Sequence, residues 1–214
     1  MISCVDLFCG AGGLSHGFMR RGIPINVGID IDPECRYPFE YNNDSHFVQR
    51  DIASLSGDEL ATWYPARDVR ILAGCAPCQP FSTYRQRADI EQGQKWSLLR
   101  EFARLVTELR PAIVTMENVP PLQRHPVFQE FVQALDTAGY AQPWCQAVEC
   151  RRYGVPQYRR RLVLLASRFG PIEMIPPTHE PDDADLTVRA RIGHLPRFRD
   201  GDADANDPLH RTSQ

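Results

Sequence analysis

Short apolar runs alternate with longer amphipathic segments along most of this 214-residue chain. Two segments, Leu98 to Leu109 and Val127 to Leu135, show the apolar spacing of a helix most clearly. Strand and helix in alternation are typical of a parallel sheet that helices cover on both faces. The sequence therefore predicts an α/β fold with a mostly parallel, seven-stranded sheet. The predicted strands are Ser3 to Phe8, Ile25 to Ile29, His46 to Gln49, Val69 to Ala73, Ala112 to Met116, Trp144 to Val148 and Leu162 to Ala166.

The last part of the chain departs from this alternation. Only Glu149 to Arg161, rich in Gly, Pro and Arg, separates the last two predicted strands, so we expect the last strand to be antiparallel. From Pro171 onward the sequence is Pro-rich and acidic, with one weak apolar patch from Leu186 to Leu195. We therefore predict a folded domain over 1–170 and an extended linker over 171–214.

Charge and cysteine content narrow the class of protein. A formal net charge of -3 argues against a chain that coats nucleic acid through charge alone. No secretory signal and no apolar stretch of membrane-spanning length is visible, so we expect a cytoplasmic protein with seven reduced cysteines. An anion-binding face is expected near a cluster of arginines, which are Arg151, Arg152, Arg159, Arg160 and Arg161.

A glycine-rich segment, Asp6 to Ser15, ends the first predicted strand in glycines and opens a helix at Leu14 to Met19. Glycines allow close approach of backbone amides, and a helix N-terminus favours a carboxylate or phosphate. The spacing is neither Gly-x-Gly-x-x-Gly nor that of a P-loop. Asp30 lies at the end of the second strand and Asp51 after the third, where they could bind the ribose and the adenine amino group of an adenosine ligand. A tight turn with two surface acids is the alternative.

Three strand ends carry groups suited to acid–base and nucleophilic chemistry. Cys78 follows the fourth predicted strand, Glu117 and Asn118 follow the fifth, and Arg159 and Arg161 enter the seventh. Such ends converge on one edge of a parallel sheet. A thiolate, a carboxylic acid and guanidinium groups suit covalent addition to an electron-poor ring, in which the acid protonates a ring nitrogen.

Each of these features also has a simpler interpretation. Cys75 and Cys78 could form half of a zinc site or a redox dithiol. Zinc is disfavoured because the other close pair, Cys145 and Cys150, has the wrong spacing and no histidine companion. A thioredoxin-like role lacks its usual aromatic and glycine neighbours. Glu117 alone could be a solvated carboxylate, and the arginines a solvated charge run.

Taken together, four segments resemble the DNA (cytosine-5)-methyltransferase family in composition, order and spacing. The similarity runs from the first predicted strand to the seventh and implies a Rossmann-like S-adenosylmethionine-dependent methyltransferase fold. It also implies methylation of DNA, as in restriction–modification systems. The segments are Asp-Leu-Phe-x-Gly-x-Gly-Gly at Asp6 to Gly13, Pro-Cys-Gln-Pro-Phe-Ser at Pro77 to Ser82, Glu-Asn-Val at Glu117 to Val119, and Gln-x-Arg-x-Arg at Gln157 to Arg161.

The resemblance implies that S-adenosyl-L-methionine is the cofactor and that no metal is needed. It places the ribose at Asp30, the adenine near Asp51 and Ile52, and the rest of the cofactor along the glycine-rich turn and the fourth strand. The residues implied to bind the cofactor are Phe8, Ala11, Gly12, Gly13, Asp30, Ile31, Asp51, Ile52, Pro77 and Leu98.

The resemblance also implies a reaction. Cys78 would attack C6 of a cytosine, Glu117 would hold and protonate N3, and Arg161 would contact the base near O2. The implied partner is double-stranded DNA with the cytosine flipped out of the stack, because the reacting atoms are inaccessible inside a duplex. The other residues implied to contact substrate or phosphate are Ser82, Asn118, Gln157 and Arg159.

The similarity stops before the target-recognition region of such enzymes, although the residues around Thr187 and Pro196 resemble the lead-in to it. We therefore expect this chain to be the catalytic part of a longer or split enzyme, completed by a C-terminal partner that carries target recognition. Three other functions stay open: a non-catalytic S-adenosylmethionine- or DNA-binding module, an RNA cytosine-5 methyltransferase, and a nicotinamide dehydrogenase. The glycine spacing weakens the last of these.

Overall fold

The computed structural model describes residues 1–77, 97–140, 142–180, 183 and 186–195. Chain contacts divide it into two units, described separately below. The first contains Met1–Val148 and Arg160–Ile175, and the second contains Glu149–Arg159 and Pro176–Gln214. The predicted division at residue 170 remains a prediction.

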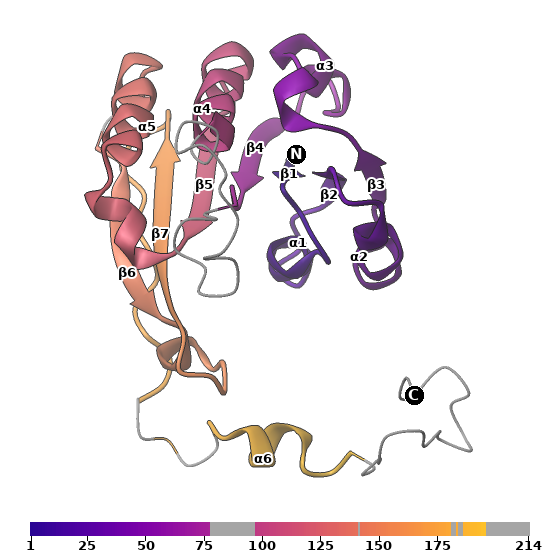
Figure 1. Ribbon diagram of the computed structural model, residues 1–214, viewed down its shortest axis with the longest axis vertical. Helices are drawn as coiled ribbons and strands as arrows, with labels where there is room; N and C mark the ends of the chain where they lie inside the picture. The colour runs from indigo at the N-terminus through magenta and orange to yellow at the C-terminus, as the bar shows by residue number, and fades with distance from the viewer. Residues whose placement is uncertain (78–96, 141, 181–182, 184–185, 196–214) are drawn as a thin grey trace, which may run out of the picture. The chain divides into compact units, whose positions relative to one another are not determined.

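The first unit is built on a seven-stranded sheet in the order β3-β2-β1-β4-β5-β7-β6 (Figure 1). The pairs β1–β2, β1–β4, β2–β3 and β4–β5 are parallel, whereas β5–β7 is antiparallel. The predicted α/β class and the antiparallel last strand are confirmed. The strands are β1 Ile2–Leu7, β2 Ile25–Asp30, β3 His46–Gln49, β4 Val69–Gly74, β5 Ile113–Asn118, β6 Trp144–Glu149 and β7 Arg160–Ser167.

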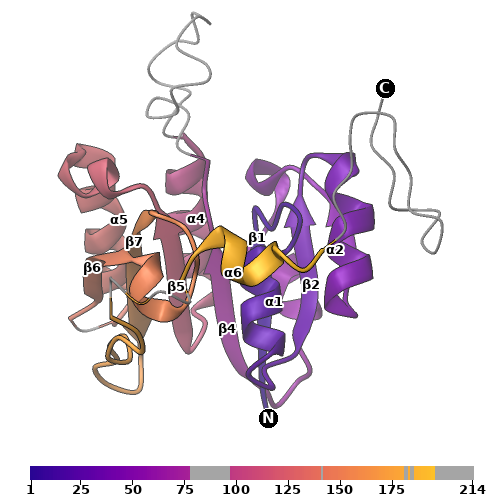
Figure 2. The same ribbon diagram turned by 90° about the horizontal axis from the view of Figure 1, so that it is seen from below.

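Helices cover both faces of this sheet, as Figures 1 and 2 show from two directions. Neighbouring strand residues point to opposite faces, so Cys4 packs in the cluster under the first two helices and Val5 in the cluster under the other three. The 3-10 turns η1 Pro33–Cys35, η2 Ile52–Ser54 and η6 Pro120–Arg124 connect these elements. The helices are α1 Gly13–Met19 and α2 Arg36–Asn43 on one face, and α3 Gly57–Thr62, α4 Ser97–Leu109 and α5 Pro126–Thr137 on the other.

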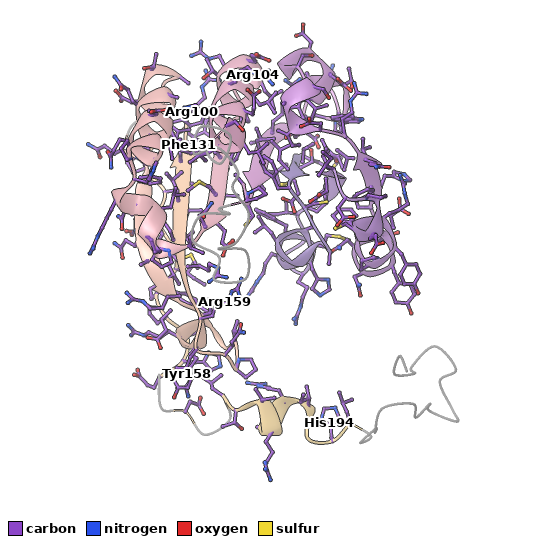
Figure 3. All side chains as sticks on the ribbon, in the orientation of Figure 1. Arg100, Arg104, Phe131, Tyr158, Arg159 and His194 are labelled. Carbon is purple, nitrogen blue, oxygen red and sulfur yellow. The ribbon has the colours of Figure 1, made fainter. Side chains whose placement is uncertain are left out.

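The larger core lies between the sheet and the pair α4 and α5. Phe102 of α4 and Phe131 of α5 are buried, with ring centroids 5.3 Å apart (Figure 3). Arg100 and Arg104 lie on the outer side of α4, where Arg100 pairs with Glu130 of α5 at 2.7 Å. The amphipathic spacing that predicted both helices therefore reflects one buried face and one charged face.

The second unit contains the turn η7 Cys150–Tyr153 and the short helix α6 Val188–Ile192. Extended chain was expected at α6, and the structure corrects this locally. The Thr187 hydroxyl accepts a hydrogen bond from the Ala190 amide at 3.1 Å, which is an N-cap that the sequence signals only weakly in so short a segment. None of the helices that the structure describes is both long and apolar enough to cross a membrane.

Candidate active site

The loop after β1 turns through left-handed backbone conformations into α1. Phe8, Gly10 and Gly12 have φ angles of 58°, 51° and 87°. At Gly12 a side chain is excluded sterically as well, because an added Cβ would lie 2.1 Å from Nδ2 of Asn43. The loop therefore presents backbone rather than side chains where it meets α1.

Asp30, at the end of β2, holds this glycine loop in place. Its Oδ2 accepts a hydrogen bond from the Gly10 amide at 3.0 Å, and its Oδ1 accepts one from the Asp32 amide at 3.1 Å. An ionised carboxylate has about four lone-pair positions, so about two remain for the hydroxyl groups of a ligand. Asp30 is only half-buried and accessible for that purpose.

Backbone hydrogen bonds join the ends of β1 to β4 at one edge of the sheet. The Arg50 amide donates to the Asp30 carbonyl at 2.9 Å, and the Cys75 amide donates to the Leu7 carbonyl at 3.3 Å. The residues predicted to bind the cofactor follow these strand ends, except Leu98, which is half-buried at the start of α4. The structure thus brings the four strand ends together, as the convergence argument expects.

The predicted cofactor residues differ in what their side chains offer. Ile31 is 65% exposed and free to contact a ligand, whereas Ile52 is 3% exposed and belongs to the core. Asp51 is exposed and caps η2, because its Oδ1 accepts the Ala53 amide at 3.0 Å. Ala11, Gly13 and Pro77 are exposed. A shallow, open pocket beside the glycine loop is lined by Ala11, Gly12, Gly13, His16 and Asn42.

Asp6 in β1 is a buried acid beneath the glycine loop that sequence analysis did not single out. Its Oδ2 accepts a hydrogen bond from the Ser15 hydroxyl of α1 at 2.6 Å, and its Oδ1 has no hydrogen-bond partner among the described residues. Burial raises the pKa of Asp6 to about 6, and the Ser15 hydrogen bonds oppose that rise. The signal available in the sequence was an acid inside a strand that is otherwise apolar except for Ser3.

Glu117 forms the centre of a second cluster at the end of β5. Its Oε1 lies 2.5 Å from Nε of Arg161 in β7, and its Oε2 accepts a hydrogen bond from the Cys75 thiol at 2.8 Å. Glu117 is opposite Val163 in the antiparallel β5–β7 pair. Arg161 lies two residues before Val163 in β7, so its side chain reaches the Glu117 carboxylate. The structure therefore brings Glu117 and Arg161 together.

Asn118 is buried, and its amide group is used inside the protein. Its Nδ2 donates to the Ala76 carbonyl at 2.9 Å, and its Oδ1 accepts from the Val119 amide at 2.8 Å. Asn118 therefore anchors the segment that leads from β4 toward Cys78. Cys78 itself and Ser82 lie outside the described residues.

Gln157 and Arg159 belong to the second unit, where both are exposed (Figure 3 labels Arg159). The Arg159 carbonyl accepts a hydrogen bond from the Cys150 amide at 2.8 Å. In the same unit, the Arg151 guanidinium lies 4.3 Å from the ring centroid of Tyr158, a cation–π contact. In the described part of the chain, no three His, Cys, Asp or Glu side chains gather as a metal site.

Comparison with known proteins gives one consistent family. A model of the C-5 cytosine-specific DNA methylase family matches residues 2–206. The type II methylase M.HgiDII of Herpetosiphon aurantiacus is 44% identical over 98% of this chain and 59% of its own length. The type II methyltransferase M.XorII of Xanthomonas oryzae is 36% identical over 90% of this chain and 46% of its own. The chain thus spans about half the length of these relatives.

A shorter relative and the solved structures extend the comparison. The type II methyltransferase M.AquIA of Picosynechococcus is 30% identical, and the match covers 84% of this chain and 77% of that protein. The structure of a putative DNA modification methyltransferase from an E. coli prophage superimposes with a TM-score of 0.76 at 25% identity, over 96% of this chain and 59% of that one. S. pombe Dnmt2, with a TM-score of 0.66 at 18% identity over 81% of this chain and 51% of that one, shares the fold.

Proposed function

Because the chain belongs to the C-5 cytosine-specific DNA methylase family, we propose that it carries the catalytic part of an enzyme that methylates C5 of cytosine in DNA. The observation that carries this proposal is the Glu117 cluster. The Glu117 carboxylate lies at the end of β5, where Arg161 holds one oxygen and the Cys75 thiol donates to the other. Cys78 follows Cys75 by three residues in the sequence. An acid of this kind, together with a nucleophilic cysteine that is close in sequence to Cys75, suits addition to a nucleobase ring.

The residues at the ends of β1 and β2 fit S-adenosylmethionine, which would supply the methyl group when bound. The glycine loop offers backbone amides beside the start of α1, and Gly12 has no room for a side chain. Asp30 retains lone pairs for ribose hydroxyls after its two amide hydrogen bonds. Ile31 and Asp51 are both exposed, so they could contact the adenine side of the cofactor.

The proposed reaction assigns one role to each chemical group. The Cys78 thiolate forms a bond to C6 while Glu117 delivers a proton to N3. This proton neutralises the negative charge that the attack would otherwise leave on the ring. Arg161 keeps the Glu117 carboxyl group oriented through Oε1. After C5 has accepted the methyl group, N3 returns its proton to Glu117 and the C5 proton is lost to solvent water. The electron pair of the C5–H bond then expels the Cys78 thiolate, which restores the aromatic ring and the enzyme.

We also propose that target recognition resides outside this chain, in a further segment or a partner subunit. The chain spans 59% and 46% of two longer relatives but 77% of M.AquIA, so proteins of similar length occur in the family. The substrate in this proposal is double-stranded DNA with its cytosine flipped out, at a cost of a few kcal/mol that protein contacts must offset.

Trapping with a modified base tests the function. The full chain, mixed with S-adenosylmethionine, duplex DNA containing 5-fluorocytosine and the C-terminal region of M.HgiDII supplied as a separate polypeptide, should form a covalent adduct on Cys78. Fluorine at C5 cannot leave as the proton does, so the final elimination stops. Mass spectrometry of the peptide locates the adduct. An adduct that persists unchanged in Cys78→Ala contradicts the proposal.

A non-catalytic binding module is the second candidate, favoured by the share of the relatives that this chain spans. Isothermal calorimetry with S-adenosylmethionine separates the two functions. Cofactor binding without adduct formation or methyl transfer, even after the recognition region has been supplied, would support the binding module.

A further inference from the structure

We infer that Cys75 is a positioning residue for Glu117: its thiol holds Oε2 while Arg161 holds Oε1, so that the carboxyl group keeps one orientation throughout the reaction. The two contacts are 2.8 Å and 2.5 Å long. This inference rests on the proposed function, because it explains how the acid of that reaction is held. It assigns a role to the first cysteine of the Cys-x-x-Cys pair, which is not the proposed nucleophile.

The backbone around Cys75 is fixed on both sides. Its own amide donates to the Leu7 carbonyl of β1 at 3.3 Å. The carbonyl of the next residue, Ala76, accepts the side-chain amide of Asn118 at 2.9 Å. In the β4–β5 pair, Gly74 is aligned with Met116, so Cys75, the first residue after β4, lies beside Glu117 of β5. The backbone contacts of the sheet therefore fix the place from which the Cys75 thiol reaches Glu117.

A thiol differs from other hydrogen-bonding groups in what it does during proton transfer. It is both a weak donor and a weak acceptor, so it can donate to the Glu117 carboxylate and accept from the protonated acid. Burial, together with the nearby Glu117 charge, raises the pKa of Cys75, which keeps the thiol protonated and neutral. Cys75 can thus stay in contact while Glu117 loses its proton to N3 and later regains one. Arg161, which is always charged, serves as the constant partner.

Infrared spectroscopy tests the contact without requiring activity. The S–H stretching band lost in Cys75→Ala identifies the Cys75 thiol, and its frequency falls as the hydrogen bond strengthens. Glu117→Gln replaces a charged acceptor by a neutral one, and hydrogen bonds to charged groups are roughly twice as strong. We expect the Cys75 band to move to higher frequency in Glu117→Gln. A band that stays in place overturns the inference, whether or not the protein methylates DNA.

The kinetic test compares two substitutions at Cys75 in the 5-fluorocytosine assay. Cys75→Ala should slow adduct formation about tenfold with little change in the DNA concentration at half-maximal rate, as expected for one hydrogen bond to a charged group. Cys75→Ser keeps a donor and an acceptor and should restore the rate to within about threefold of the original protein. Equal losses in both variants would contradict a positioning role.

The matched control is Cys145→Ala in β6. The Cys145 thiol is partly buried like that of Cys75, but burial is the cause that raises its pKa, to about 11, with no carboxylate involved. Cys145→Ala should leave both the Cys75 band and the adduct rate unchanged. A wild-type chain that forms no adduct but shows the infrared shift would refute the proposed function and leave the contact established.

The pH profile of the rate gives a readout that a purely structural residue would not move. The titratable or charged groups around the cluster, within the described residues, are Cys75 after β4, Arg161 in β7 and Asp6 in β1, which acts on Cys75 electrostatically. The thiol hydrogen bond stabilises the carboxylate form of Glu117, and Cys75→Ala removes it. The decrease of the rate at alkaline pH should therefore begin at a higher pH in Cys75→Ala than in the original protein. An unshifted profile would mean that Cys75 does not act on the acid.

Discussion

The glycine loop and the Glu117 cluster lie at the same edge of one sheet but are organised by different groups. In the glycine loop the contacts are backbone amides, fixed by left-handed residues and by the Asp30 carboxylate. In the Glu117 cluster they are side chains from β5, from β7 and from the residue that follows β4, with Cys75 and Arg161 on the two carboxylate oxygens. A ligand-binding loop of this kind depends on conformation, whereas an acid centre depends on the identity of each side chain.

This contrast predicts that a conservative change at Glu117 has the largest effect on catalysis. Glu117→Gln keeps the shape but removes the proton that N3 receives, and positioned acids contribute about 100-fold to 10000-fold to rates. We expect adduct formation to slow by about a thousandfold, in the middle of that range, with folding intact by circular dichroism. The control Glu130→Gln makes the same change in the exposed Arg100 pair and should leave the rate unaltered. Equal slowing in both variants would remove Glu117 from the mechanism.

Asp6 lies beneath the glycine loop, and its titration should appear in stability rather than in the chemical step. Its folded pKa of about 6 exceeds the ordinary value of 3.8, so the folded state favours the protonated acid. That stabilisation is complete below the unfolded pKa and is lost as the pH rises through 6. Asp6→Asn mimics the neutral acid, so we expect it to match the original protein near pH 4 and to be more stable by about 3 kcal/mol at pH 7.

Denaturant unfolding at both pH values measures this difference directly. Asp136→Asn, an exposed acid in α5, serves as the control and should leave the pH dependence as it was. A stability difference between Asp6→Asn and the original protein that is the same at pH 4 and pH 7 would show that Asp6 titrates like an exposed carboxyl group.

A smaller effect is expected from adding one methyl group to the glycine loop. Two features of Gly12 oppose a side chain: its φ of 87°, and Nδ2 of Asn43, which would lie 2.1 Å from an added Cβ. Left-handed strain costs about 1–3 kcal/mol, so we expect Gly12→Ala to weaken S-adenosylmethionine binding about 30-fold by calorimetry. Gly17→Ala in helix α1 is the control, because a Cβ added there would meet no atom of the rest of the protein within 4 Å. Similar affinities in the two variants would mean that the loop tolerates side chains.

Local sequence patterns carried much of the fold and part of the site. Period and alternation located all seven strands within about two residues of their observed ends, and the strand-end argument anticipated that Glu117 and Arg161 would meet. The helix α6 was missed because five residues give too little periodicity to recognise. The contact between Cys75 and Glu117 was also missed, since the Cys-x-x-Cys spacing directs attention to zinc or redox chemistry.

What local patterns could not supply was the partner of each polar atom. The order and spacing of the motifs are properties of the chain alone, so the α/β class and the family resemblance could be read from them directly. The length of a hydrogen bond is decided within a few tenths of an ångström, and that depends on how strands distant in sequence are aligned. The register of β4, β5 and β7 places Cys75 and Arg161 on the two oxygens of Glu117. The packing of α1 against β1 buries Asp6 against Ser15 and changes its acidity.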